Sequence, residues 1–314
     1  MVEKQKEIVL LGPTAVGKTK VSVIVAQVLG AEIVSADSRL VYKELDIGTA
    51  KPTMEERGGV PHHLIDVVDI WSEFTVADFQ KLAFKALDDI HSRGRKALVV
   101  GGTGLYLRAL VDLPSYQNVP PMPDLRREIM KEIQEYGSLA LYEELKRFDP
   151  SAASKIHPNN IPRLVRAVEV VRATGRRFSE VIEHDRRRKA ESPYNWLLIG
   201  LTMDRGKLYD RINRRVKEMV QRGWVDEVRA LIAKGATGEE KPLKGLGYKD
   251  IIAYLVGKQS LDEAVEKIQR DTRRFAKRQM TFFRMINDVK WIEVDYSEAP
   301  QDVARKVISL IESS

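Results

Sequence analysis

The chain has no cysteine among its 314 residues. This absence excludes a disulfide-stapled scaffold and any metal site built on thiolates, and it is typical of proteins from a reducing compartment. No apolar run approaches membrane-spanning length, and because residues 1–7 are charged we expect no signal peptide. Internal repeats and low-complexity segments are also missing. We therefore expect a cytoplasmic protein that does not associate with membranes.

Positive charge is in excess, with 52 Lys and Arg against 45 Asp and Glu, for a formal net charge of +7. Two segments concentrate it: residues 163–189 hold nine basic and four acidic residues, and residues 267–284 hold seven basic residues and one acidic residue. A solvated helix face is the ordinary explanation for one such segment. Two of them, with arginines at helical spacing, favour binding to a phosphodiester backbone. A nucleic acid is therefore a candidate partner.

The most informative motif is G-x-x-x-x-G-K-T at residues 12–19, between the apolar run 8–11 and a helical pattern. In such a loop, backbone N–H groups and the helix N-terminus surround a phosphate, Lys18 adds a positive charge, and Thr19 can bind Mg²⁺. The motif alone does not distinguish ATP from other phosphate compounds. The predicted phosphate-binding residues, of which Thr19 is also the predicted magnesium ligand, are Gly12, Pro13, Thr14, Ala15, Val16, Gly17, Lys18 and Thr19.

Strand-like runs at 8–11, 32–36 and 97–100 alternate with helical patterns such as 76–91. This alternation predicts an α/β fold, with a parallel sheet like that of the P-loop NTPases and helices on both faces. Residues 114–123 contain four prolines and are predicted to form a linker.

Residues 124–192 show helical periodicity without a strand signal, which predicts an inserted all-helical subdomain. Strand-like runs return at 196–201 and 289–294. We accordingly divide the chain into three parts: residues 1–120 as the first part of the α/β core, residues 121–193 as the helical insertion, and residues 194–314 as the second part of the core with basic C-terminal helices.

Three loops follow the carboxyl ends of predicted strands, where open parallel sheets bind their ligands. They are the phosphate loop, Ser35–Ser38 and Gly101–Gly104. Asp37 is the only carboxylate among them, and it could be a metal partner, a general base or a turn-capping residue. Thr103 could equally cap a helix. The strand at 97–100 runs into glycines where P-loop nucleotidases usually carry an acid that holds Mg²⁺, which weakens an ATPase interpretation.

A series of further motifs accompanies the phosphate loop: Ser35–Ser38, Asp46–Pro52, Pro61–Leu64, Val100–Tyr106, His157–Asn160, Arg166–Val170, Thr174–Gly175 and Ala276–Gln279. In this order the motifs resemble those of the bacterial tRNA dimethylallyltransferases, also called tRNA isopentenyltransferases. The resemblance covers nearly the whole chain. Only the phosphate loop is specific by itself, but the order of the motifs is specific to this family.

The resemblance implies transfer of a dimethylallyl group from dimethylallyl diphosphate to N6 of adenosine 37, beside the anticodon, in tRNAs that read codons beginning with U. The products would be N6-isopentenyladenosine and diphosphate. By the same resemblance, Asp37 is the base that removes the N6 proton, and Thr103 helps to place the adenine or the diphosphate. The phosphate loop and Mg²⁺ would then stabilise the charge that builds up on the leaving diphosphate.

The resemblance also implies base flipping and a helical insertion that grips the anticodon stem-loop. Pro162 departs from the family, which commonly has a polar or basic residue there. Arg211 and Arg215 are candidate diphosphate ligands, or else part of a solvated helix face. We expect a monomer, with tRNA and dimethylallyl diphosphate as partners and Mg²⁺ as cofactor. The expected tRNA-binding residues are Asp37, Ser38, Arg39, Leu40, Thr103, Arg126, Pro162, Arg163, Leu164, Val165 and Arg166, with Lys277 and Arg278 from the second basic segment.

Three other functions stay open at this point. The chain could be a small-molecule or nucleoside kinase, an isopentenyltransferase acting on free AMP or ATP, or a non-catalytic RNA-binding protein with a relic loop. The long basic insertion argues against the first two, and the intact Lys18, Thr19 and Asp37 argue against the third. No zinc-finger spacing follows Arg284, so the additional RNA-binding module of some eukaryotic relatives is not expected.

Overall fold

The computed structural model describes residues 4–112, 119, 122–187 and 192–314. The predicted linker at 114–123 lies almost entirely outside the described residues, as do Arg188 and Lys189 of the first basic segment. The chain forms two compact units, one of residues 1–110 with 193–314 and one of residues 111–192. No helix within the described ranges is both long and apolar enough to cross a membrane.

The first unit is built on a six-stranded sheet in which every strand pairing is parallel. This confirms the predicted α/β fold. The order across the sheet is β3-β2-β4-β1-β5-β6. The strand β3 is not among the predicted strands because two residues are too few to show an alternating pattern. The strands are β1 (Gln5–Leu11), β2 (Ala31–Ser35), β3 (His62–His63), β4 (Lys96–Gly101), β5 (Tyr194–Thr202) and β6 (Lys290–Glu293).

The carboxyl ends of β1, β2 and β4 meet at one edge of the sheet. Leu11 of β1 is in register with Gly101 of β4, and Ser35 of β2 is in register with Val100 of β4. The three loops that the sequence singles out therefore follow strands that are neighbours in the sheet.

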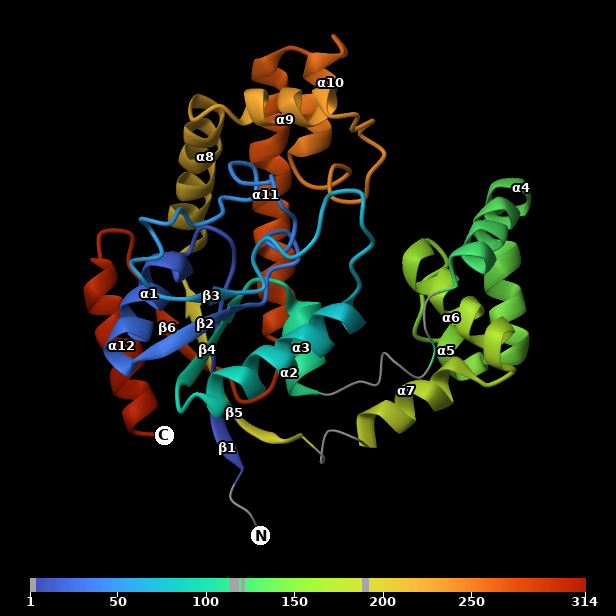
Figure 1. Cartoon of the computed structure of the whole chain (residues 1–314). Coiled ribbons are helices and arrows are strands. Elements are labelled where there is room, and N and C mark those ends of the chain that lie inside the picture. The colour runs from blue at the N-terminus through green and yellow to red at the C-terminus, as the bar shows by residue number, and fades with distance from the viewer. Residues whose placement is uncertain (1–3, 113–118, 120–121, 188–191) are drawn as a thin grey trace. The chain divides into compact units, whose positions relative to one another are not determined.

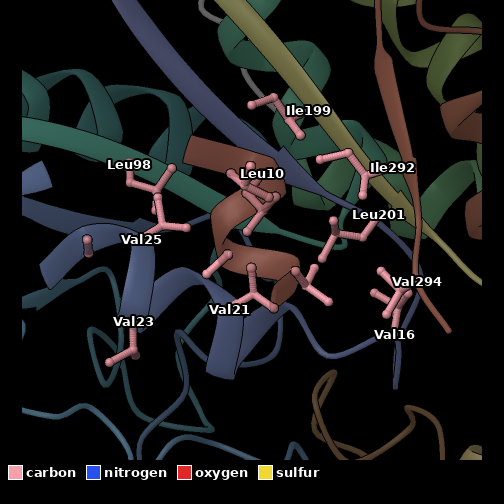
Figure 2. Packing of buried hydrophobic residues seen from close by; sticks show 14 of the residues in the cluster. Leu10, Val16, Val21, Val23, Val25, Leu98, Ile199, Leu201, Ile292 and Val294 are labelled. Carbon is pink, nitrogen blue, oxygen red and sulfur yellow. The ribbon is translucent and has the colours of Figure 1, made fainter. Parts of the chain in front are cut away.

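Helices cover both faces of this sheet, α1 (Lys18–Leu29) and α12 (Pro300–Glu312) on one side and α2 (Val76–Ser92) and α3 (Gly104–Val111) on the other (Figure 1). Figure 2 shows Leu10 and Leu98 from the strands packed with Val21 and Val25 from α1. Val9, the neighbour of Leu10, is also fully buried, and successive strand residues point to opposite faces. Both faces of β1 are thus in the core, which explains its continuous apolar run.

Four more helices of the first unit lie between β5 and β6: α8 (Arg205–Gln221), α9 (Trp224–Ala233), α10 (Tyr248–Leu255) and α11 (Leu261–Phe283). In α11, Ala264, Ile268 and Ala276 are buried at helical spacing, whereas Lys277 and Arg278 are exposed. The basic segment at 267–284 is therefore mainly one amphipathic helix with most of its cations toward solvent.

The second unit contains helices and no strand in its described residues: α4 (Pro123–Phe148), α5 (Pro150–Ala153), α6 (Ile161–Thr174) and α7 (Phe178–Arg187). Its core includes Ile129 and Leu145 from α4 and Leu164 from α6. The buried Asp149 accepts the amide of Ala152 at 2.9 Å and that of Ser179 at 2.7 Å. This carboxylate caps α5 and ties it to α7.

Candidate active site

The phosphate loop joins the carboxyl end of β1 to the N-terminus of α1. Gly12 packs against β5, since a Cβ at this position would lie 2.6 Å from the carbonyl oxygen of Leu201. Gly17 is the N-cap of α1 with a φ of 107°, a backbone conformation that favours glycine. No side chain caps α1, so the amides of its first turn are available to an anion.

Lys18 lies over the beginning of this loop. Its Nζ donates hydrogen bonds to the carbonyl oxygens of Gly12 and Pro13, both at 2.8 Å. Burial lowers the pKa of Lys18 to about 8; the Asp37 carboxylate opposes this shift, and the positive charge of Arg215 adds to it. Lys18 and Asp37 therefore act on each other across two strand ends.

Helix α8 brings two more cations to the loop, Arg211 and Arg215. A Cβ at Gly17 would lie 3.7 Å from Nη2 of Arg211. Burial lowers the pKa of Arg215, with Asp37 opposing the shift and Arg211 adding to it. The side chains of these two predicted diphosphate ligands thus lie at the phosphate loop and not on a face remote from it.

Within the described part of the chain, Lys18, Arg211 and Arg215 form no ion pair with an Asp or Glu at 4.0 Å or less. Partly buried positive charges gathered without a carboxylate in direct contact are unfavourable, and the nearby Asp37 offsets this only in part. Together with the amides of α1, this cluster fits a ligand with several negative charges, such as a diphosphate.

Asp37 and Thr103 come from the ends of neighbouring strands, β2 and β4. Oδ1 of Asp37 accepts the N–H of Arg39 at 2.8 Å. The hydroxyl of Thr103 accepts the N–H of Ser38 at 2.9 Å and donates to Oγ of Ser38 at 3.2 Å. Thr103 therefore holds the loop in which Asp37 lies.

Arg39 extends this loop toward α10. Its guanidinium lies over the ring of Tyr248, 5.9 Å from the ring centre, and against Gly245, where a Cβ would collide with it. Its Nη2 is buried and has no hydrogen-bond partner. The hydroxyl of Tyr248 donates to Glu227 at 2.8 Å. Arg39 thus presents an unpaired donor in the segment that carries Asp37.

Two polar residues that hold the site, Glu227 and Gln279, were not singled out by the sequence. Glu227 accepts backbone amides of residues 46–48. Gln279 accepts the amide of Thr14 at 2.9 Å and donates to the carbonyl oxygen of Gly102 at 2.7 Å. The only signal for Gln279 was its place in the motif Ala276–Gln279, and Glu227 had none.

In the second unit, Arg126 and Arg166 share one buried carboxylate. Nη2 of Arg126 lies 3.0 Å and Nη1 of Arg166 lies 2.6 Å from Oε2 of Glu169. Burial by itself would raise the pKa of Glu169, but hydrogen bonds from Arg126, the Met122 amide and Arg166 lower it below its ordinary value. Both arginines therefore contribute to the packing of this unit.

The predicted tRNA-binding segment Pro162–Arg166 is divided by burial. Pro162 and Arg163 are exposed at the start of α6. Leu164 and Val165, by contrast, are only 0% and 6% exposed and belong to the core. A side chain in the core is not available to RNA, so the predicted tRNA contacts of Leu164 and Val165 would have to come from the main chain.

The residues at the phosphate loop also fit a Mg²⁺ ion that is bound together with phosphates. Thr19 is exposed at the start of α1, and Asp37 offers a carboxylate at the same sheet edge. The described ranges contain no group of three or more His, Cys, Asp or Glu residues that could hold a metal ion. Mg²⁺ is commonly bound through one or two protein oxygens, substrate phosphates and water, which matches this small donor set.

The model of the family named IPP transferase matches residues 40–286. A tRNA dimethylallyltransferase from Halalkalibacterium halodurans is 43% identical over 312 residues, which cover 98% of each chain. Another, from Acetivibrio thermocellus, is 46% identical over 300 residues, which cover 96% of this chain and 95% of the relative.

Solved structures agree with these similarities. A full-length tRNA isopentenylpyrophosphate transferase from Bacillus halodurans has a TM-score of 0.72 and 42% identity, covering 99% of this chain and 98% of that one. A eukaryotic dimethylallyltransferase acting on tRNA has a TM-score of 0.80 and 26% identity, covering 98% of this chain and 80% of that one. The chain therefore belongs to the IPP transferase family, the family of the tRNA dimethylallyltransferases.

Proposed function

We propose that this enzyme transfers a dimethylallyl group from dimethylallyl diphosphate to N6 of adenosine 37 in tRNAs that read codons beginning with U. The observation that carries the proposal is the cluster of Lys18, Arg211 and Arg215 at the phosphate loop, with Asp37 as the carboxylate that acts on it. Such a site combines a place for a polyphosphate leaving group with one candidate base.

The phosphate loop binds the diphosphate, which is the leaving group. As the bond between C1 of the dimethylallyl group and the diphosphate oxygen breaks, its electron pair stays on the diphosphate. The amides of α1, Lys18 and the two arginines of α8 stabilise this developing charge. Thr19 would hold Mg²⁺ together with the diphosphate, and the bound ion would neutralise part of the same charge.

Asp37 removes the proton from N6 as the new bond from N6 to C1 forms. The exocyclic amine of adenine is a weak nucleophile until it loses that proton, so a positioned carboxylate contributes directly to the rate. Thr103 keeps the loop of Asp37 in place through Ser38 and helps to place the adenine. The proton ends on the carboxylate, and diphosphate leaves.

Recognition of tRNA uses the exposed cations. We assign the helical insertion, residues 121–193, to the anticodon stem-loop, with Arg163 as an exposed contact. Lys277 and Arg278 add phosphate contacts from α11, whereas the buried guanidinium of Arg39 supports the loop that carries Asp37. The target adenine must leave its stack to reach Asp37, so the reaction includes base flipping. A single chain supplies all of these residues, so the proposed enzyme works as a monomer, and we assign it to the cytoplasm, where its tRNA substrates are.

The proposal is tested by incubating the full-length protein with Mg²⁺, dimethylallyl diphosphate and a synthetic anticodon stem-loop that carries adenosine 37. Mass spectrometry of the digested RNA should find N6-isopentenyladenosine, and none when guanosine replaces the target adenosine. AMP and ATP are offered as acceptors in parallel, and ATP as a phosphoryl donor. Product on AMP but not on RNA, or phosphoryl transfer from ATP, would contradict the proposal.

The role of Asp37 is tested in the same assay. Asp37→Asn should abolish turnover while leaving RNA binding largely intact, because the amide keeps the size but cannot take a proton. Asp302→Asn is the matched control, since Asp302 is a partly exposed residue of α12 that pairs with Arg305 of the same helix. Unchanged turnover in Asp37→Asn would exclude Asp37 as the base.

A further inference from the structure

Gln279 on α11 joins the phosphate loop to the loop that follows β4. Its side chain is only 7% exposed. Oε1 accepts the amide of Thr14 at 2.9 Å, and Nε2 donates to the carbonyl oxygen of Gly102 at 2.7 Å. One carboxamide thus satisfies a donor in one loop and an acceptor in the other, which fixes the spacing between the two loops.

A second residue of the same helix contacts the loop after β4. Phe282 lies three positions beyond Gln279, on the same helix face, and packs against Gly104, where a Cβ would collide with its ring. Thr103 lies next to Gly104 and binds Ser38 through its hydroxyl. Direct contacts therefore lead from α11 to both loops of the reaction site.

The other side of α11 is a cationic surface. Lys277 and Arg278, directly before Gln279, are exposed, and Arg274 one turn earlier is 64% exposed. In the part of the chain that the structure describes, neither Lys277 nor Arg278 has an Asp or Glu within 4.0 Å. A polyanion that binds these side chains binds the same helix that holds the phosphate loop.

We propose that Gln279 is a positioning residue through which RNA bound on α11 holds the phosphate loop in its diphosphate-binding form. RNA and diphosphate then bind with positive cooperativity. The inference rests on the proposed function, which supplies these two ligands. Gln279 acts on Lys18 through the loop backbone, because Lys18 is bonded to the carbonyls of Gly12 and Pro13 immediately before Thr14.

The test measures the affinity of the full-length protein for inorganic diphosphate with Mg²⁺ by calorimetry, with and without a saturating synthetic anticodon stem-loop. In the wild type the stem-loop should tighten diphosphate binding about five- to tenfold. In Gln279→Ala, the ratio of the diphosphate affinity with the stem-loop to the affinity without it should be close to one, while each ligand still binds alone. Gln279→Glu keeps the acceptor for Thr14 but loses the donor for Gly102, and it should give an intermediate ratio.

Thr281→Ala is the matched control, because Thr281 is also on α11 and its exposed hydroxyl donates to the carbonyl oxygen of Lys277 in the same helix at 3.0 Å. It should keep the wild-type ratio. If Gln279→Ala does not fold, Gln279→Ser is measured in the same way. A wild-type ratio of one, or a wild-type ratio retained in a folded Gln279 variant, would overturn the inference. Failure of the wild type to prenylate the stem-loop would instead contradict the proposed function.

Discussion

The carboxylate of Glu227 on α9 lies 2.6 Å from the backbone nitrogen of Ile47, 180 positions earlier in the chain. It also accepts the amide of Asp46 at 2.8 Å, the amide of Gly48 at 3.2 Å and the hydroxyl of Tyr248 at 2.8 Å. Charged acceptors form the stronger hydrogen bonds in proteins. A single side chain on a distant helix therefore fixes the loop that continues from β2.

Glu227→Ala is expected to leave these four donors without their acceptor and to lower the free energy of unfolding by about 2–4 kcal/mol. Because the same loop begins with Asp37, kcat for prenyl transfer should fall about tenfold or more, with a smaller change in KM. Urea denaturation and steady-state kinetics measure the two effects. Asp226→Ala is the control, since Asp226 is 75% exposed and pairs with Arg229 of the same helix. Equal losses in the two variants would contradict a specific role for Glu227.

Lys18 should make diphosphate binding depend on pH. Burial lowers its pKa to about 8, with a further contribution from Arg215 and an opposing one from Asp37. The ammonium form attracts diphosphate, so affinity should be greatest below about pH 8 and should fall as the pH rises through that value. Asp37→Asn removes the charge that raises this pKa, and the fall in affinity should then begin at lower pH. Calorimetry with inorganic diphosphate across this pH range gives both curves.

Diphosphate itself also titrates, and measuring its affinity for Lys18→Arg separates this effect from the titration of Lys18. A guanidinium stays charged throughout this pH range, whereas diphosphate titrates equally in both experiments. The difference in diphosphate affinity between the wild type and Lys18→Arg should therefore grow above about pH 8. Parallel curves for the wild type and Lys18→Arg would assign the pH dependence to another group.

Local sequence patterns were sufficient to predict which residues meet at the carboxyl ends of the strands. The motif at 12–19 determines its own backbone conformation, and the rule that parallel sheets bind ligands at their carboxyl ends places Asp37 and Thr103 nearby. Both residues lie there in the structure. The sequence could not decide whether Arg211 and Arg215 face solvent, because that depends on which side of α8 packs into the core.

The residues that sequence analysis missed depend on contacts between distant segments. Gln279 and Thr14 are 265 positions apart, and no local periodicity connects them. Burial is a second property that such a motif does not give: a motif carried over from relatives names Leu164 and Val165 but does not tell that their side chains face the core. The helical spacing of apolar residues in α6 contains that information and is the better guide at such positions.

Arg163 offers the simplest test of RNA binding by the helical insertion. It is exposed at the start of α6, whereas Arg166 is held by Glu169. Arg163→Ala should weaken stem-loop binding about three- to tenfold and reduce the slope of log affinity against log salt by about one, with little change in melting temperature. Lys85→Ala, which removes an exposed charge from α2, should change neither quantity. A lower melting temperature with unchanged RNA affinity would mean that Arg163 stabilises the fold and does not contact RNA.

Glu7 of β1 is an ionisable group in the core, remote from the phosphate loop along its strand. It is 1% exposed, and Oε1 lies 2.8 Å from Nε2 of His91 on α2. Burial raises the pKa of Glu7 from 4.5 to about 8 and lowers that of His91. Tyr194 of β5 packs edge-on against His91 and donates to Asp88 at 2.9 Å, so the other titratable groups around the pair lie on α2 and β5.

A carboxyl whose pKa is raised by folding binds its proton more tightly in the folded state, so its contribution to stability is full below about pH 4.5 and is lost as the pH rises through about 8. Glu7→Gln stays neutral at every pH. The free energy of unfolding of Glu7→Gln relative to the wild type should therefore rise between these two values, by at most about 1.4 kcal/mol for each pH unit, and level off above. Urea denaturation at a series of pH values measures the difference, with the exposed Glu55→Gln as a control that should give a flat line. A flat line for Glu7→Gln as well would mean that Glu7 is ionised in the folded protein.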